Sequence, residues 1–163
     1  MQRLLCRNIV QLSGATGMNA HRINGYYEPI DEIVGNATVY KKMGDGADMW
    51  IEYYAGTGDW YVRPTSDRGT DRGWAAATIS PARPLEDCRR SCWQIDDGSN
   101  WVNQASFSVS ISSRASFEAA YAAEVISLSI YIKNMHILTF SKDIMHIIFC
   151  IYMNLYINIY KYI

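Results

Sequence analysis

Short apolar runs alternate with turn residues along the first two-thirds of the chain. The run MWIEYY, residues 49–54, is followed by AGTGD and then by WYVRP at residues 60–64. Two β-type runs joined by five residues that include two glycines predict a hairpin. A second hairpin is predicted within residues 92–102, where Asp97-Gly98 offers the left-handed backbone of a tight turn. Further strands are predicted at residues 25–29, 38–43, 73–80 and 106–110.

This strand spacing predicts a mainly β fold, a small antiparallel meander closed into a sandwich or barrel. No ten-residue stretch before residue 113 shows a helical period. A domain of about a hundred residues buries roughly two-thirds of its chain surface, so this fold needs no metal or disulfide. Cys88 and Cys92 have no further cysteine or histidine nearby, and we expect the cysteines to be free thiols.

The composition changes near residue 110. All eleven glycines and all four prolines lie at or before Gly98, and all five tryptophans lie between Trp50 and Trp101. We therefore predict three parts: an N-terminal segment at residues 1–10, a β-rich module at residues 11–110 and a hydrophobic extension at residues 111–163.

The extension is predicted to be mainly helical. Residues 116–125 contain good helix formers, whereas VISLSIYI at residues 125–132 favours strand by its branched side chains. Residues 144–163 contain no Gly, Ala, Arg or Pro, the composition expected of translated A- and T-rich non-coding sequence, which makes the extension a candidate gene-model artefact. Alternatively, residues 144–163 have the length of a membrane span or form an amphipathic helix that anchors the protein.

Five segments share a pattern with a known kind of module, namely Asn24-Gly25-Tyr26, the runs that hold Trp50 and Trp60, Gly73-Trp74-Ala75, and residues 93–98. In them the chain resembles a Trp- and Gly-rich β repeat found, often in tandem, in large multidomain proteins of unicellular algae and other protists. The resemblance covers residues 11–110 and departs from the pattern at Ala47 and at Asp96-Asp97. It implies an all-β fold and brings no catalytic residues.

Charge and motifs argue against several function classes. The net charge of −1 gives no basic patch of the kind that nucleic acids bind. His21 is the one histidine of the β region, and neither a nucleophile motif nor the spaced acids of a calcium loop are present. We therefore predict a protein that is not an enzyme, with no cofactor, no metal site and no catalytic residues. A cytoplasmic location is favoured for the β module, and membrane association if the extension is real.

Aromatic and arginine side chains are the candidates for ligand binding. Paired aromatic residues on one strand must point to opposite faces, so some rings are expected at the surface, where they bind peptides or sugars. The duplicated DRGTDRG, residues 67–73, could cradle an anion with its two arginines, although a polar turn is the favoured interpretation. The candidate site residues are Tyr27, Tyr54, Tyr61, Arg68 and Arg72.

The favoured function is a non-catalytic interaction or structural β module whose partner, a protein or a glycan, the sequence does not identify. Two alternatives stay open. One is a membrane-attached protein anchored by residues 144–163. The other is a carbohydrate- or peptide-binding domain that uses exposed Trp and Tyr side chains.

Overall fold

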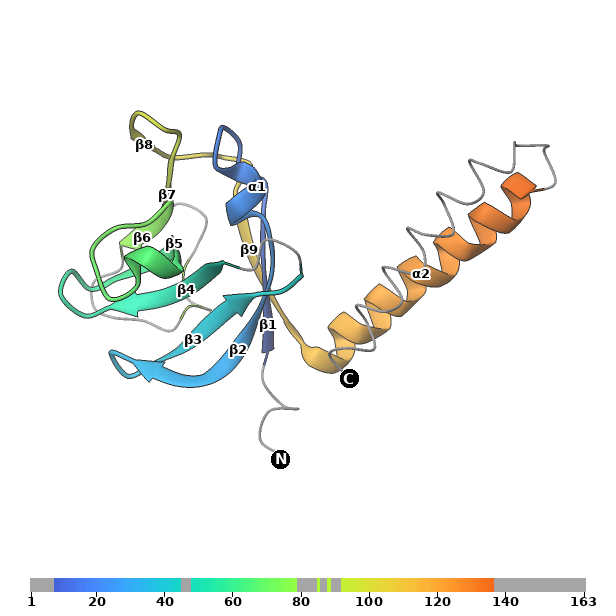
Figure 1. Ribbon diagram of the computed structural model, residues 1–163, viewed down its shortest axis with the longest axis horizontal. Helices are drawn as coiled ribbons and strands as arrows, with labels where there is room; N and C mark the ends of the chain where they lie inside the picture. The colour runs from blue at the N-terminus through green and yellow to red at the C-terminus, as the bar shows by residue number, and fades with distance from the viewer. Residues whose placement is uncertain (1–7, 45–47, 79–84, 86–87, 89–91, 137–163) are drawn as a thin grey trace. The chain divides into compact units, whose positions relative to one another are not determined.

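The computed structural model describes residues 8–44, 48–78, 85, 88 and 92–136. The chain divides into two compact units, residues 1–114 and residues 115–163. The first unit is one nine-stranded antiparallel sheet with a short helix α1 (Ala20–Ile23) (Figure 1). Its strands are β1 (Asn8–Ser13), β2 (Gly25–Val34), β3 (Ala37–Lys42), β4 (Met49–Tyr54), β5 (Asp59–Pro64), β6 (Ala75–Thr78), β7 (Trp93–Asp96), β8 (Trp101–Val102) and β9 (Ser108–Ser113).

The sheet is a curled half-barrel. Its strand order is β8-β7-β6-β5-β4-β3-β2-β1-β9, so β8 and β9 are the two edges although they follow each other in the chain. Only residues 103–107 connect them, a length that spans about 20 Å when fully extended. A flat sheet of nine strands would separate its edges by roughly 38 Å, given about 4.8 Å between neighbours. The sheet must therefore curl, and the prediction of a mainly β antiparallel meander followed by a helical extension is confirmed.

Both predicted hairpins are present. β4 pairs with β5 in continuous register, and β7 pairs with β8 around the Asp97-Gly98 turn. The predicted strands at 25–29, 38–43, 73–80 and 106–110 correspond to β2, β3, β6 and β9, with β2 and β9 longer than expected. β1, which starts within the predicted N-terminal segment, is the strand that the sequence analysis missed. It pairs with β2 and β9 on its two sides and so extends the sheet beyond residues 11–110.

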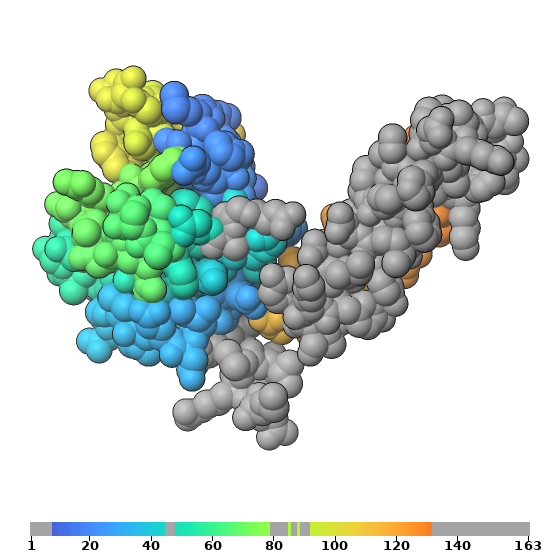
Figure 2. Space-filling model, viewed as in Figure 1, coloured from blue at the N-terminus to red at the C-terminus, as the bar shows by residue number. Residues whose placement is uncertain are grey.

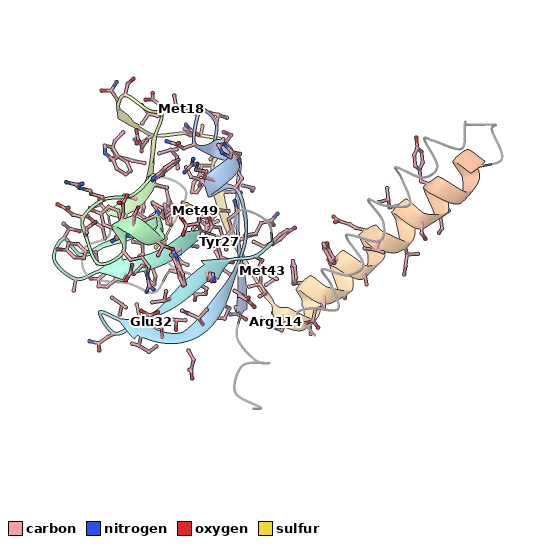
Figure 3. The ribbon with its side chains drawn as sticks, viewed as in Figure 1. Met18, Tyr27, Glu32, Met43, Met49 and Arg114 are labelled. Carbon is pink, nitrogen blue, oxygen red and sulfur yellow. The ribbon has the colours of Figure 1, made fainter. Side chains whose placement is uncertain are left out.

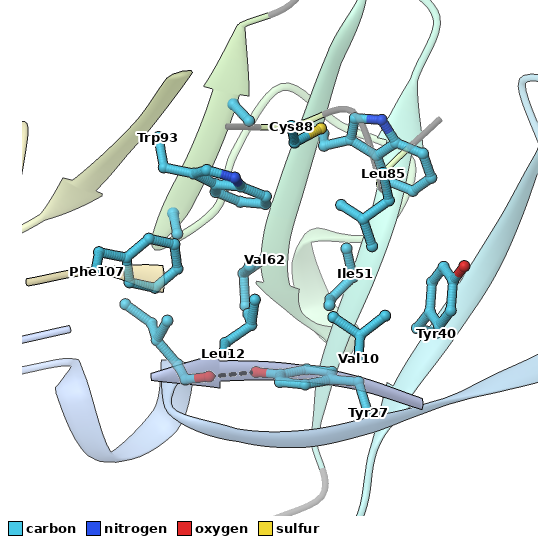
Figure 4. Packing of buried hydrophobic residues seen from close by; sticks show 14 of the residues in the cluster. Val10, Leu12, Tyr27, Tyr40, Ile51, Val62, Leu85, Cys88, Trp93 and Phe107 are labelled. Atoms are coloured by element: carbon cyan, nitrogen blue, oxygen red, sulfur yellow. Dashed lines mark hydrogen bonds between the residues drawn. The ribbon is translucent and has the colours of Figure 1, made fainter. Parts of the chain in front are cut away.

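The concave face of the sheet holds the apolar core. Trp93 on β7 packs against Phe107, with the ring centroids 5.6 Å apart, and both side chains are buried. Leu85 and Cys88, from the long connection between β6 and β7, also lie in this core (Figure 4). The strands supply their inward alternate residues, and the connection adds the apolar side chains that fill the hollow of the curl.

The segment between β1 and α1 is hydrogen-bonded to the connection between the sheet edges. The Thr16 amide donates to Gln104 Oε1 at 2.7 Å, and Gln104 Nε2 donates back to the Thr16 carbonyl at 3.1 Å. Ser106 Oγ donates to the Gly14 carbonyl at 2.7 Å. Gly14 has φ +78°, and a Cβ there would overlap the Ser106 carbonyl oxygen, so only glycine permits this approach.

The second unit is described through α2 (Arg114–His136). The helix runs through residues 125–132, so the strand preference assigned to them is wrong. Branched residues favour strands where a pleated surface packs against them, and residues outside a sheet lack that surface. No helix within the described part of the chain is long and apolar enough to cross a membrane. The predictions made for residues 144–163 lie outside the described residues.

Candidate functional site

Tyr27 lies in the core. It is fully buried on β2, and its hydroxyl donates to the Ile23 carbonyl at the end of α1 at 2.8 Å. Burial raises the pKa of the Tyr27 hydroxyl. Lys42 Nζ donates to the neighbouring carbonyls of His21 and Arg22 at 3.0 and 2.8 Å, and burial lowers its pKa. Tyr27 therefore satisfies the last turn of α1 rather than facing a ligand (Figures 3 and 4).

Tyr54 and Tyr61 lie side by side on the convex face, on β4 and β5. Their ring centroids are 6.4 Å apart in an edge-to-face arrangement. Tyr61 is buried, its hydroxyl donates to Asp59 Oδ2 at 3.3 Å, and burial is the main cause that raises its pKa. The Tyr54 ring lies against Gly56, where an added Cβ would approach it to 2.6 Å. Both rings pack within their own hairpin.

Arg63, which the sequence analysis did not select, is the centre of the convex face. Its side chain is fully buried, and Nη1 donates to the carbonyls of Asp67 and Thr70. The guanidinium lies over the Tyr61 ring at 4.4 Å, and its Nε is 4.0 Å from the buried carboxylate of Glu52. Burial lowers the Arg63 pKa, partly offset by the negative charge of Glu52. An outward-facing strand position beside aromatic neighbours is the signal that could have identified it.

The two arginines of the duplicated DRGTDRG have different environments. The Arg68 guanidinium lies over the Trp50 ring at 4.3 Å, with Nη2 at 2.5 Å from Glu32 Oε1 and Nε at 3.6 Å from Glu52 Oε2. Arg72 is exposed, and its backbone amide donates to Thr70 Oγ1. The carboxylates of Glu32 and Glu52 already pair with Arg68. Residues 67–73 form a polar turn over the convex face, and Gly69 in this turn has φ +73°.

Asp96 and Asp97 accept hydrogen bonds from backbone amides of the turn between β7 and β8. Asp97 Oδ1 accepts the amides of Ser99 and Asn100, both at 2.9 Å, and these bonds lower its pKa. Asp96 Oδ1 accepts the Gly98 amide at 2.9 Å. Within the described ranges, no three His, Cys, Asp or Glu side chains are grouped as metal ligands would be. Residues 45–47, which include Asp45, lie outside those ranges.

Two exposed apolar side chains of the described sheet unit lie at or beside the β7–β8 hairpin, whereas a third, Ile33, lies on β2. Trp101 on β8 keeps 42% of its surface exposed and Met18 keeps 73%. The turn with Met18 contacts this hairpin, since the Met18 Cε would lie 3.5 Å from a Cβ on Gly98. Figures 2 and 3 show the two segments at the same end of the sheet unit. We call Met18, Asp96, Asp97 and Trp101 the corner surface.

Comparison of this chain with protein-family models, with curated proteins and with solved structures gives no match. The resemblance to a Trp- and Gly-rich repeat therefore stays a prediction.

Proposed function

We propose that the protein is a non-catalytic interaction module that binds a protein partner through the corner surface. The observation that carries this proposal is the contrast between Trp101 and the other tryptophans. Trp60 and Trp93 are buried in the core, Trp74 lies under the Arg22 guanidinium, and Trp50 contacts Arg68. Trp101 is the tryptophan with a large exposed area, and exposed aromatic side chains on a rigid hairpin are typical anchors of protein interfaces.

The experiment that tests this proposal compares matched surface variants of the full chain. Immobilised wild type, Trp101→Ala, Met18→Ala and Ile33→Ala are exposed to an extract of the expressing cells, and cross-linked proteins are quantified. Ile33 is the control because it is 62% exposed but lies on β2. We expect at least one protein whose capture falls about tenfold in the first two variants and stays unchanged with Ile33→Ala. Equal capture by all four chains would contradict the proposal.

A carbohydrate-binding domain is the second candidate, favoured by the same exposed indole of Trp101. Sugars stack on an open aromatic face, and the faces of Trp50 and Tyr61 already meet guanidinium groups. A glycan panel separates the two candidates. Binding of a defined glycan that disappears in Trp101→Ala would favour the carbohydrate function, whereas binding that survives in that variant would count against it.

A further inference from the structure

Two partly buried tryptophans, Trp50 and Trp74, each lie against an arginine of the same chain. Arg68 lies over the Trp50 ring at 4.3 Å, and Lys41 Nζ is 5.2 Å from the same ring. Arg22 lies over the Trp74 ring, also at 4.3 Å. Each of these half-buried indoles therefore attracts a cation from its own chain, as the negative face of the ring favours.

Carboxylates complete the arrangement at Trp50. Glu32 and Glu52 contact the guanidinium that lies on that ring, at 2.5 and 3.6 Å. The group is thus an indole and two carboxylates with an arginine between them. Arg68 is held by the face of the Trp50 ring and by the two carboxylates together, and the two kinds of contact bind a guanidinium more strongly than either does alone.

The corner surface has the same chemical components without the arginine. Asp96 is the cross-strand partner of Trp101, so their side chains leave the sheet on the same face. Asp97 follows directly, and residues 93–102 contain no lysine or arginine. Within the described residues, no cation lies over the Trp101 ring and no ion pair reaches Asp96 or Asp97, although Arg22 is on the neighbouring α1.

The two carboxylates are oriented by backbone amides of the turn. The turn amides hold Oδ1 of Asp96 and Oδ1 of Asp97, which sets the orientation of each carboxylate. The amides of Ser99 and Asn100 hold the pKa of Asp97 below its usual range. No described residue donates to the second oxygen of either group. Those oxygens are available to an incoming donor, and the Asp96 carboxylate leaves the sheet on the same face as the exposed indole.

We propose that the corner surface binds a lysine- or arginine-bearing segment of a protein partner, with the cation between the Trp101 ring and the carboxylates of Asp96 and Asp97. This inference rests on the proposed function and adds the charge of the partner. Met18 supplies apolar contact for the stem of the bound side chain. The segment takes the place that Arg68 occupies beside Trp50.

The test uses three peptides of eight residues that alternate serine with arginine, with citrulline or with glutamate. Citrulline keeps the shape of arginine and removes its charge. Each peptide is titrated into the ¹⁵N-labelled full chain while the Trp101 indole N–H signal, assigned with Trp101→Phe, is followed. We expect a saturable shift with the arginine peptide and binding about tenfold weaker with the citrulline peptide. The double variant D96N/D97N, which keeps the Oδ1 acceptors of the turn, should weaken arginine-peptide binding several-fold.

Failure of this inference differs from failure of the proposed function. If the citrulline or glutamate peptide shifts the Trp101 signal with the same affinity as the arginine peptide, the cationic partner is contradicted and the corner remains a binding surface. If no peptide shifts the Trp101 signal, the cationic partner is again contradicted. The cross-linking experiment with Trp101→Ala then shows whether the corner surface binds any protein partner. A shift of the Trp50 signal in place of the Trp101 signal would place peptide binding at β4 rather than at the corner surface, and would contradict the inference.

Discussion

The two faces of the sheet are buried by different chemistry. The concave face is closed by apolar side chains such as Trp93 and Phe107, whereas the convex face of β4 and β5 is closed over Arg63 and Glu52. Arg63 is as fully buried as the core residues. An alternating strand pattern assigns side chains to faces, but it does not show that a polar loop will cover the outer face.

This difference has an energetic consequence. Apolar burial stabilises by area and tolerates small changes in geometry. A buried guanidinium requires partners, because removing one partner leaves the other charge in a medium that does not solvate it. On the convex face, removing one charged partner should therefore destabilise the fold more than removing both partners together. On the concave face, the losses from two apolar substitutions should instead accumulate. The predictions below test this contrast, from the largest effect to the smallest.

Phe107→Ala should lower the free energy of unfolding by about 3–5 kcal/mol, because it leaves a cavity against Trp93 in the core. Urea unfolding followed by tryptophan fluorescence measures the change. Met18→Ala is the control: its side chain is exposed, and its effect should stay below about 0.5 kcal/mol. Equal effects of the two substitutions would show that Phe107 does not lie in the core.

Arg63→Met should lower the free energy of unfolding by about 3 kcal/mol, because the Glu52 carboxylate stays buried with fewer positive partners. The double variant Arg63→Met/Glu52→Leu should recover at least half of that loss, since both buried charges are then absent. The same urea titration provides both values and their coupling. If the stability losses of the two single substitutions simply add in the double variant, Arg63 and Glu52 are not coupled, and the contrast between the two faces is contradicted.

Arg68→Ala and Arg72→Ala compare the two halves of the duplicated DRG. Arg68→Ala should cost about 1–2 kcal/mol through the lost Trp50 and Glu32 contacts, whereas exposed Arg72→Ala should change stability by less than about 0.5 kcal/mol. Thermal unfolding of both variants checks this. A larger effect of Arg72 would contradict the placement of residues 67–73 as a cover.

Tyr27→Phe should cost about 1 kcal/mol at neutral pH, the value of the hydrogen bond to Ile23. Burial raises the folded pKa of Tyr27 above its unfolded value of about 10. The unfolded chain therefore releases this proton above about pH 10 while the folded chain retains it, and stability present below pH 10 is lost as pH rises further.

The difference between wild type and Tyr27→Phe isolates this effect from the other titrating groups. Above about pH 10 the advantage of the wild type should shrink by roughly 1.4 kcal/mol per pH unit and reverse near pH 11. Urea unfolding of both chains between pH 7 and 11 measures it. Parallel stability curves would show that Tyr27 ionises freely and is not in the core.

The sequence predicts the hairpins well because their evidence is local. The β4–β5 and β7–β8 pairs join alternating runs through glycine-bearing turns, and both lie where the pattern places them. β1 was missed because one of its two partners, β9, lies about a hundred residues later in the sequence, and no turn residue marks the start of β1. Long-range pairing leaves little trace in a local pattern.

The candidate site was less predictable for a related reason. Tyr27, Tyr54 and Tyr61 were selected because adjacent aromatic residues on one strand point to opposite faces. Tyr27 lies in the core, however, and the convex face at Tyr61 is covered by Arg63. Trp101 is exposed because β8 is a two-residue edge strand with one neighbour. Which ring is open depends on strand order and on the loop at residues 67–73, and neither is encoded in periodicity.

Hydrogen exchange of the five tryptophan indole N–H groups, measured by ¹⁵N NMR, tests most directly the claim that the convex face of β4 and β5 is covered and that the corner surface is open. Trp101 should exchange fastest, Trp50 should be slowed by its 2.7 Å bond to Thr65 Oγ1, and Trp93 should be strongly protected. If Trp50 exchanges as fast as Trp101, the convex face is open and the account is contradicted. Protection of Trp101 equal to that of Trp93 would contradict the corner surface.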